Sequence, residues 1–97
     1  MEIAQLHLDT EFEWDEAKRL KVLAEREIDF KQAARSLLTP HLEKRSDRGH
    51  ETRVLALCEL SSELVAIIYT MRDGKCRIIT ARAARRNERR EHRQIFR

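Results

Sequence analysis

Residues 46–53, which read SDRGHETR, bring together an imidazole, carboxylates and guanidinium groups, the side-chain types that metal-free cleavage of RNA uses. Such cleavage needs a base that removes the ribose 2′-OH proton, an acid that protonates the departing 5′-oxygen, and cations that stabilise the crowded phosphate. The imidazole of His50 titrates nearest neutral pH, so it is the natural acid or base. The alternative interpretation is a polar turn held by local salt bridges. The candidates, placed around Gly49, are Asp47, Arg48, His50, Glu51 and Arg53.

A second cationic stretch, RIITARAARRNERREHR, covers residues 77–93 and contains seven arginines. Arginine grips phosphate oxygens in a bidentate manner, so RNA is one candidate ligand. An acidic protein groove would suit the same charge, and a solvated surface helix is the third interpretation. Like charges four residues apart destabilise a helix slightly, so helical order here would be coupled to binding an anion. The candidates for binding RNA or a partner are Arg48, Arg85, Arg86, Glu88, Arg89 and Arg90.

A change from strand to helix near Ala83 divides these arginines. The Asp-Gly pair at 73–74 predicts a hairpin turn, because type I′ turns need positive φ at both central positions. Residues 75–82 (KCRIITAR) are then the returning strand, which carries Arg77 and Arg82. Residues 83–95 have a helix-forming composition. Two groups of cations therefore sit on different elements, although composition alone treats them as one.

The remaining elements predict an α+β fold. Residues 52–60 and 63–71 are strand-like, the second apolar on both faces as in a central strand, and residues 42–46 are expected to form an edge strand. Residues 11–14 (EFEW) predict a short strand. We expect a short N-terminal strand, two helices on one face of an antiparallel sheet of three to four strands, and a C-terminal basic helix.

Two helices are expected between the short strand and the sheet. Asp15 is placed to cap the first helix. Asp29 begins the second, and Gln32 follows three residues later in the spacing of a capping box. Pro40 ends this helix, because proline cannot continue the hydrogen-bonded ladder.

Composition fits one domain over residues 1–97, with residues 1–11 as a candidate N-terminal arm. Net charge is +3, but acids dominate residues 1–16 and arginines dominate residues 77–97, which favours a nucleic acid or an acidic partner. Cys58 is expected to be a buried free thiol, which suits a reducing cytoplasm. The isolated histidines, His7, His41 and His92, are expected at the surface, and no zinc-type spacing predicts a metal or other cofactor. No apolar run is long enough for a membrane span.

Four blocks stand in one order over residues 12–92: FEWDEAK, DFKQAA, DRGHETR and GKCRIITARAARRNERREH. In that order and spacing they resemble the BrnT family of bacterial type II toxins. The resemblance implies a RelE-like ribonuclease fold and RNA cleavage that inhibits translation without a metal cofactor. It also implies a BrnA-type antitoxin that covers the toxin in a hetero-oligomer and carries the DNA-binding domain, so that operator DNA is bound only through the antitoxin.

The resemblance also implies roles for individual residues. His50 or Glu51 would transfer the proton. Arg53, Arg77 and Arg82 would contact the phosphate. The polar positions that match the family are Asp47, His50, Glu51, Arg53, Arg77, Arg82 and Glu88.

One stretch departs from the family pattern. Glu25, Arg26 and Glu27 stand where many members have Lys-His-Gly between the two helices.

A second hypothesis belongs to another class: a non-catalytic module whose arginine helix binds nucleic acid or an acidic protein. Catalysis requires the 47–53 groups, Arg77 and Arg82 to converge on one cleft, whereas a binding module does not.

Overall fold

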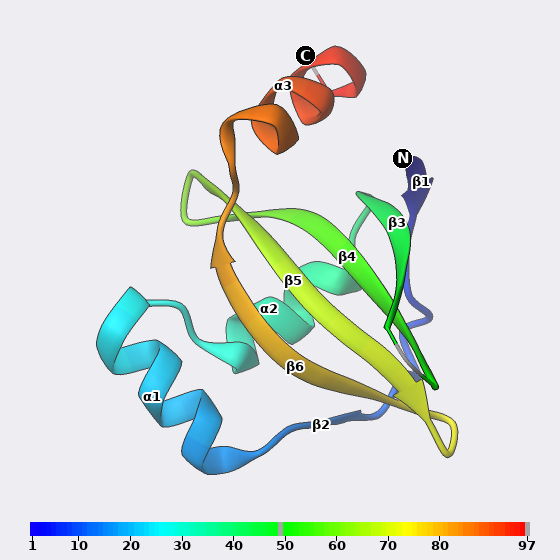
Figure 1. The fold of residues 1–97 in the computed structure, drawn as a ribbon, viewed down its shortest axis with the longest axis vertical. Coiled ribbons are helices and arrows are strands. Elements are labelled where there is room, and N and C mark those ends of the chain that lie inside the picture. The colour runs from blue at the N-terminus through cyan, green and yellow to red at the C-terminus, as the bar shows by residue number, and fades with distance from the viewer. Residues whose placement is uncertain (49, 97) are drawn as a thin grey trace.

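The structure is a computed structural model that describes residues 1–48 and 50–96, without the side chain of Arg48. Within these residues, one mixed sheet of six strands in the order β1-β3-β4-β5-β6-β2 is accompanied by three helices (Figure 1). Its four long strands are successive antiparallel neighbours: His41–Arg48 (β3), Glu51–Leu60 (β4), Glu63–Arg72 (β5) and Lys75–Ala83 (β6). The α+β class is confirmed, but six strands replace the expected three to four.

Two short strands complete the sheet, and the one at Phe12–Glu13 confirms the short strand predicted at residues 11–14. Glu2–Ala4 (β1) pairs antiparallel with β3, and Phe12–Glu13 (β2) pairs in parallel with β6. The strand predicted at residues 42–46 is confirmed as part of β3, but its first residues are not at the edge, because β1 pairs with residues 41–43. The candidate N-terminal arm thus contributes a strand to the sheet.

Helices α1 (Glu16–Arg26) and α2 (Phe30–Leu37) lie on one face of the sheet (Figure 1). Both begin at the predicted caps: Asp15 accepts hydrogen bonds from two backbone N–H groups and Asp29 from one. The predicted capping box is wrong, because the Gln32 amide donates to Ser61 Oγ (3.1 Å) on the β4–β5 turn instead of turning back to its own helix.

Each face of the sheet has its own apolar cluster. The larger one lies under α1 and α2, with Phe30, Leu37 and Ile67 fully buried. Cys58 and Cys76 belong to it, as expected for Cys58, and burial raises the pKa of each thiol to about 12. These thiols are therefore protonated and unreactive at neutral pH.

The smaller cluster lies on the opposite face and consists of Leu42, Leu57, Ala66 and Ala84. Phe96 packs against it, so the last helix, α3 (Arg86–Ile95), is anchored at both ends. We call this side of the sheet, opposite α1 and α2, the open face. Over the described residues, no helix has both the length and the apolar character that a bilayer crossing requires.

The predicted loop at residues 46–53 is instead the end of a β-hairpin. Ser46 pairs with Arg53, Asp47 with Thr52, and the backbone of Arg48 with that of Glu51, so β3 runs to Arg48 and β4 begins at Glu51. The alternation of polar residues in this stretch suits two strands with water around them, and the sequence carries no signal that separates such a hairpin tip from a loop. Gly49 lies outside the described residues.

Candidate functional site

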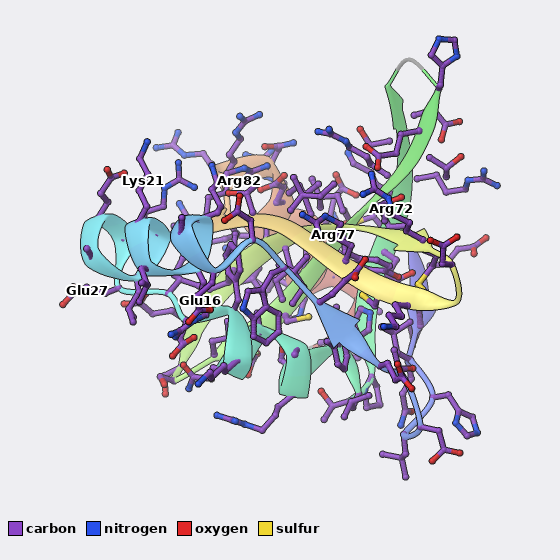
Figure 2. The ribbon with its side chains drawn as sticks, turned by 90° about the horizontal axis from the view of Figure 1, so that it is seen from below. Glu16, Lys21, Glu27, Arg72, Arg77 and Arg82 are labelled. Carbon is purple, nitrogen blue, oxygen red and sulfur yellow. The ribbon has the colours of Figure 1, made fainter. Side chains whose placement is uncertain are left out.

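Four of the five predicted catalytic residues project from the open face. Neighbouring residues in a strand point to opposite faces, and Val54, Cys76, Ile78 and Ala81 all belong to the cluster beneath the helices. Their strand neighbours therefore point the other way: Glu51 and Arg53 on β4, Arg77 and Arg82 on β6. Figure 2 shows Arg72, Arg77 and Arg82 in succession along this side of the sheet. Pairing register thus gathers cations that are far apart in the sequence.

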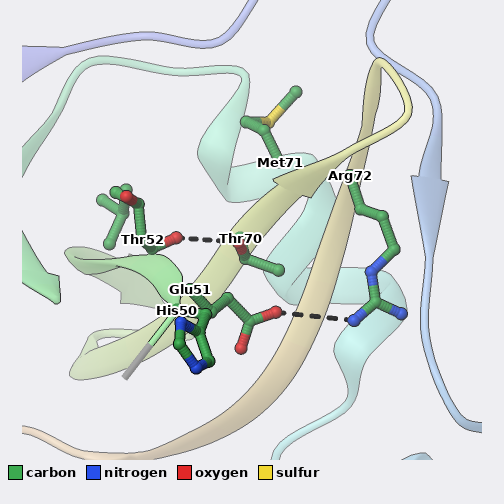
Figure 3. Close-up of a pocket in the computed structure, with 7 residues that line it drawn as sticks. His50, Glu51, Thr52, Thr70, Met71 and Arg72 are labelled. Carbon is green, nitrogen blue, oxygen red and sulfur yellow. Dashed lines mark hydrogen bonds and ion pairs between the residues drawn. The ribbon is translucent and has the colours of Figure 1, made fainter. Parts of the chain in front are cut away.

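The tip of the β3–β4 hairpin carries the proton-transfer candidates. We call the pocket there the hairpin pocket; it is lined by His50, Glu51, Thr52, Val54, Thr70, Met71 and Arg72. His50 and Glu51 lie side by side at the turn, and His50 is exposed (Figure 3). The Glu51 carboxylate is held between two guanidinium groups, with Arg53 Nε 3.2 Å from Oε2 and an Arg72 nitrogen 3.5 Å from Oε1. The two guanidinium groups therefore fix the orientation of this carboxylate.

A second pocket lies where α3 begins. We call it the helix pocket, and its lining comes from four strands and the helix: Lys44, Ser46, Arg53, Leu55, Ile68, Thr80, Arg82, Arg85, Asn87 and Glu88. Arg53 lines this pocket while donating to Glu51 of the hairpin pocket. The two pockets are therefore linked by a single guanidinium group.

Arg82 and Glu88 form the tightest ion pair on the open face. Two guanidinium nitrogens of Arg82 donate to the two carboxylate oxygens of Glu88 at 2.8 and 2.9 Å, and Glu88 Oε1 also accepts from the Arg85 backbone N–H at 2.7 Å. Only 4% of the Glu88 side chain is exposed. The hydrogen bonds from Arg82 lower the pKa of Glu88 against the opposing effect of burial, and they raise the pKa of Arg82. The pair fixes the first turn of α3 to β6.

This pair changes what Glu88 is able to contact. Glu88 was predicted among the residues that bind RNA or a partner, but its carboxylate is enclosed by Arg82 and by its own helix. Its part in binding stays a prediction, and the structure gives it an intramolecular position. The side chain of Arg48, from the same predicted set, lies outside the described residues.

The arginines further along α3 have the opposite environment. At about 3.6 residues per turn, they fall within roughly a third of the helix circumference: Arg86, Arg89, Arg90 and Arg93. All four are exposed, and none forms an ion pair with a carboxylate in the part of the chain that the structure describes. Arg89 donates one hydrogen bond to the Ala84 carbonyl (2.7 Å).

The predicted catalytic set does not meet at one point. Arg82 shares a cross-strand row with Leu57, six positions along β4 from Glu51, which is about 20 Å at roughly 3.3 Å per residue. Arg77 is nearer the hairpin, and its guanidinium is 3.9 Å from Glu13 of β2. Glu51, Arg53 and Arg77 therefore lie toward one end of the open face and Arg82 toward the other.

Other residues at these pockets had no distinguishing signal in the sequence. Arg72 reaches Glu51 only because β4 and β5 are paired, and Lys44, Thr80 and Asn87 enter the helix pocket through pairing and through the path of α3. Finding these residues would have required the register of strand pairing, which local sequence patterns do not reveal.

His41 is the clearest error of placement. It is 1% exposed, not at the surface, with Nδ1 2.7 Å from the Thr39 carbonyl and Nε2 2.6 Å from Glu43 Oε2. The Tyr69 hydroxyl donates to the same Glu43 oxygen at 2.6 Å. Burial favours protonated Glu43, but the hydrogen bonds from His41 and Tyr69 outweigh it and lower the pKa of Glu43. This network pins β3 to β5 beneath the helices, away from the open face.

Comparison with known proteins adds the family. A family model described as "Ribonuclease toxin, BrnT, of type II toxin-antitoxin system" matches residues 14–88. The chain belongs to the BrnT family. The BrnT match contains both pockets and every residue predicted for catalysis, and it ends before Arg89 and Arg90. No curated protein and no solved structure matches the chain.

The BrnT family is one of ribonuclease toxins that belong to toxin–antitoxin systems, so an antitoxin partner follows at the level of the family. A RelE-like fold stays a prediction. Among the residues that the structure describes, no group of three or more His, Cys, Asp or Glu side chains is placed to hold a metal ion.

Proposed function

We propose that this chain is an endoribonuclease toxin that cleaves RNA on the open face, next to the hairpin pocket. The observation that carries the proposal is the Glu51 carboxylate, which lies beside His50 and is held by Arg53 and Arg72 on a face crowded with cations. Membership of a ribonuclease toxin family supports the same chemistry. The surface offers candidates for the base, the acid and the phosphate-binding groups that metal-free cleavage of RNA requires.

The reaction moves two protons and exchanges one phosphorus–oxygen bond for another. Glu51 or His50 takes the proton of the ribose 2′-OH, and the 2′-oxygen attacks the adjacent phosphorus. The bond from phosphorus to the 5′-oxygen breaks, and the other of the two residues protonates that oxygen. The products are a 2′,3′-cyclic phosphate and a 5′-hydroxyl.

The arginines divide the work of holding the phosphate. Arg53 and Arg77 are nearest the hairpin end of the open face and would contact the phosphate at the reacting position. Arg82 was grouped with them from the sequence, but its guanidinium is engaged by Glu88 at the other end of the face. In this proposal Arg82 orders α3 and offers at most the rim of the helix pocket to the RNA.

In the cell, cleavage of RNA would inhibit translation until an antitoxin binds. We propose a BrnA-type antitoxin, which would cover the toxin in the cytoplasm and carry the DNA-binding domain that brings the complex to its operator. The open face is the surface that such a partner has to cover, because it bears the residues assigned to catalysis.

The test is cleavage of a defined RNA by the purified chain with EDTA present. The wild type is expected to release fragments that end in 2′,3′-cyclic phosphate. Glu51→Gln and His50→Ala should each slow cleavage about 10²-fold or more, as for loss of a general acid or base. Arg35→Ala serves as the control, because Arg35 is an exposed arginine on α2, across the sheet. Absence of both cleavage and growth arrest by the wild type would sink the proposal.

A second function has two observations in its favour. The predicted catalytic residues do not converge on one cleft, because Arg82 lies about 20 Å along the sheet from Glu51. The exposed arginines of α3 have no carboxylate partner among the described residues, which suits a module that binds without catalysis. Tight RNA binding by the wild type, with no cleavage and with equal binding by Glu51→Gln, would select this alternative.

A further inference from the structure

The helix pocket has a partly apolar floor on an otherwise charged face. Leu55 and Ile68 are paired across β4 and β5, and both are only partly buried beside the smaller core cluster. Thr80 lies next to Ile68 on β6, and Lys44 lies next to Leu55 on β3. A flat apolar strip between polar side chains suits a planar ligand, since bases in enzyme pockets lie against apolar or aromatic side chains.

The charge of this pocket suits an anion. Its lining includes four cations, Lys44, Arg53, Arg82 and Arg85, and one carboxylate, that of Glu88. Glu88 and Arg82 neutralise each other through their double hydrogen bond, so the positive charge left in the pocket is that of Lys44, Arg53 and Arg85. The cavity volume of about 400 Å³ lies within the range of ~300–1,000 Å³ that small-ligand sites occupy.

Asn87 supplies a group that is able to read a base. Its side-chain amide presents a donor and an acceptor side by side, the pattern used to recognise base edges. Asn87 is exposed and makes no side-chain hydrogen bond within residues 1–48 and 50–96, so its amide is available. The start of α3 is held by the Arg82–Glu88 pair and by the Ala84 N–H, which donates to the Leu64 carbonyl at 3.0 Å. The amide is therefore carried on an ordered support.

We propose that the helix pocket binds one base of the RNA substrate beside the cleavage position, against Leu55 and Ile68, and that Asn87 reads the edge of that base. This inference rests on the proposed ribonuclease function and names its specificity-determining residue. Arg53 connects the two sites, because it lines the helix pocket and contacts Glu51 of the hairpin pocket. A nucleotide fits this surface better than an acidic peptide does, since carboxylates gain nothing from an apolar floor.

Binding of uncleavable RNA tests the base pocket separately from catalysis. Fluorescent 2′-O-methyl hexamers of A, C or U, and an abasic hexamer, would be titrated with the full chain and followed by fluorescence anisotropy. The wild type is expected to discriminate among the three bases by tenfold or more. Asn87→Ala should reduce that discrimination to less than threefold and leave the affinity for the abasic hexamer unchanged.

Gln94→Ala is the matched control, because Gln94 is an exposed amide two helical turns further along α3 and outside the pocket. It should bind all hexamers as the wild type does. Equal binding of the three bases by the wild type, or discrimination that survives Asn87→Ala, would overturn the base pocket. RNA cleavage does not enter this measurement, so a toxin that still cleaves RNA would leave the proposed function standing.

Discussion

The arginines of the sheet and those of α3 differ in what already holds them. On the open face, each of three arginines has a carboxylate partner: Arg53 lies 3.2 Å from Glu51, Arg77 3.9 Å from Glu13, and Arg82 2.8 Å from Glu88. On α3, Arg86 and Arg90 are exposed and have no such partner among the described residues. Paired arginines are oriented before any ligand arrives, whereas unpaired ones contribute mainly long-range attraction. Arginines of equal charge therefore serve two purposes in this protein, depending on whether a carboxylate of the fold already neutralises them.

Replacement of Arg82 by alanine should give the largest effect on stability. Arg82→Ala leaves the enclosed Glu88 carboxylate without its main donor, and hydrogen bonds to charged groups are worth roughly 1.5–3 kcal/mol. We expect the free energy of unfolding to fall by about 2–3 kcal/mol, measured by urea denaturation with circular dichroism. Arg86→Ala, on the exposed side of α3, should change it by less than about 0.5 kcal/mol. Equal losses for the two variants would break the comparison.

The same pair should make the stability of the protein fall at low pH. We call this loss of unfolding free energy on acidification the acid limb. The folded-state pKa of Glu88 lies below its ordinary value, because Arg82 donates to the carboxylate and outweighs burial. The unfolded chain therefore binds this proton first, so the contribution is complete above the ordinary pKa of 4.5 and is lost as pH falls through the lowered value. Unfolding free energies at pH 6 and pH 3 should differ less in Glu88→Gln than in the wild type.

A control variant keeps that measurement specific. Glu63→Gln removes an exposed carboxylate of β5 that forms no ion pair in the described part of the chain. It should keep the acid limb of the wild type. If Glu88→Gln and Glu63→Gln lose stability in acid equally, the Arg82–Glu88 pair is not the cause.

Salt dependence should reveal the helix arginines. Each cation that neutralises a phosphate of single-stranded RNA contributes about 0.7 to the slope of log affinity against log salt. Arg86→Gln with Arg90→Gln should therefore lower that slope by about 1.4 without changing stability. The same double change at Lys31 and Arg35, two exposed cations four residues apart on α2, should leave the slope unchanged. A slope that falls equally for both pairs would show that overall charge, not α3, attracts the RNA.

Local signals in the sequence were enough to place most elements. The Asp15 and Asp29 caps, the Asp73–Gly74 turn and the strand that carries Arg77 depend on neighbouring residues alone, and each was predicted. The division of the arginines at Ala83 also depends on local periodicity, since β6 ends at that residue. The four blocks of the sequence gave the family, which the family model confirms.

Pairing between distant segments could not be predicted in the same way. No local pattern in the sequence indicates that β1 pairs with β3, that Arg72 forms an ion pair with Glu51, or that Glu88 forms one with Arg82. His41 was misplaced because one histidine between Pro40 and an apolar residue has no local mark of burial, whereas in the fold its ring contacts Glu43, which Tyr69 in turn holds. Which residues belong to the site thus depends on how the strands pair, and this pairing is known only from the folded sheet.

The smallest predicted effect lies at the corner between α1 and α2, which belongs to neither set of arginines. Glu27 ends α1 with φ of 58°, a left-handed conformation that costs a residue with a side chain about 1 kcal/mol and costs glycine nothing. Glu27→Gly should therefore raise the free energy of unfolding by about 0.5–1 kcal/mol.

Glu25→Gly, two residues earlier, is the matched control and should act in the opposite direction. Glu25 lies inside α1, where glycine lowers stability by roughly 0.5–1 kcal/mol because it loses more backbone freedom on folding. Urea denaturation measures both variants, and neither should alter the salt dependence of RNA binding, because neither changes α3 or the open face. If both variants destabilise the fold, the left-handed cap is not strained. If Glu27→Gly changes the salt slope, charge at this corner acts on RNA together with the two arginine sets, and the division between them is incomplete.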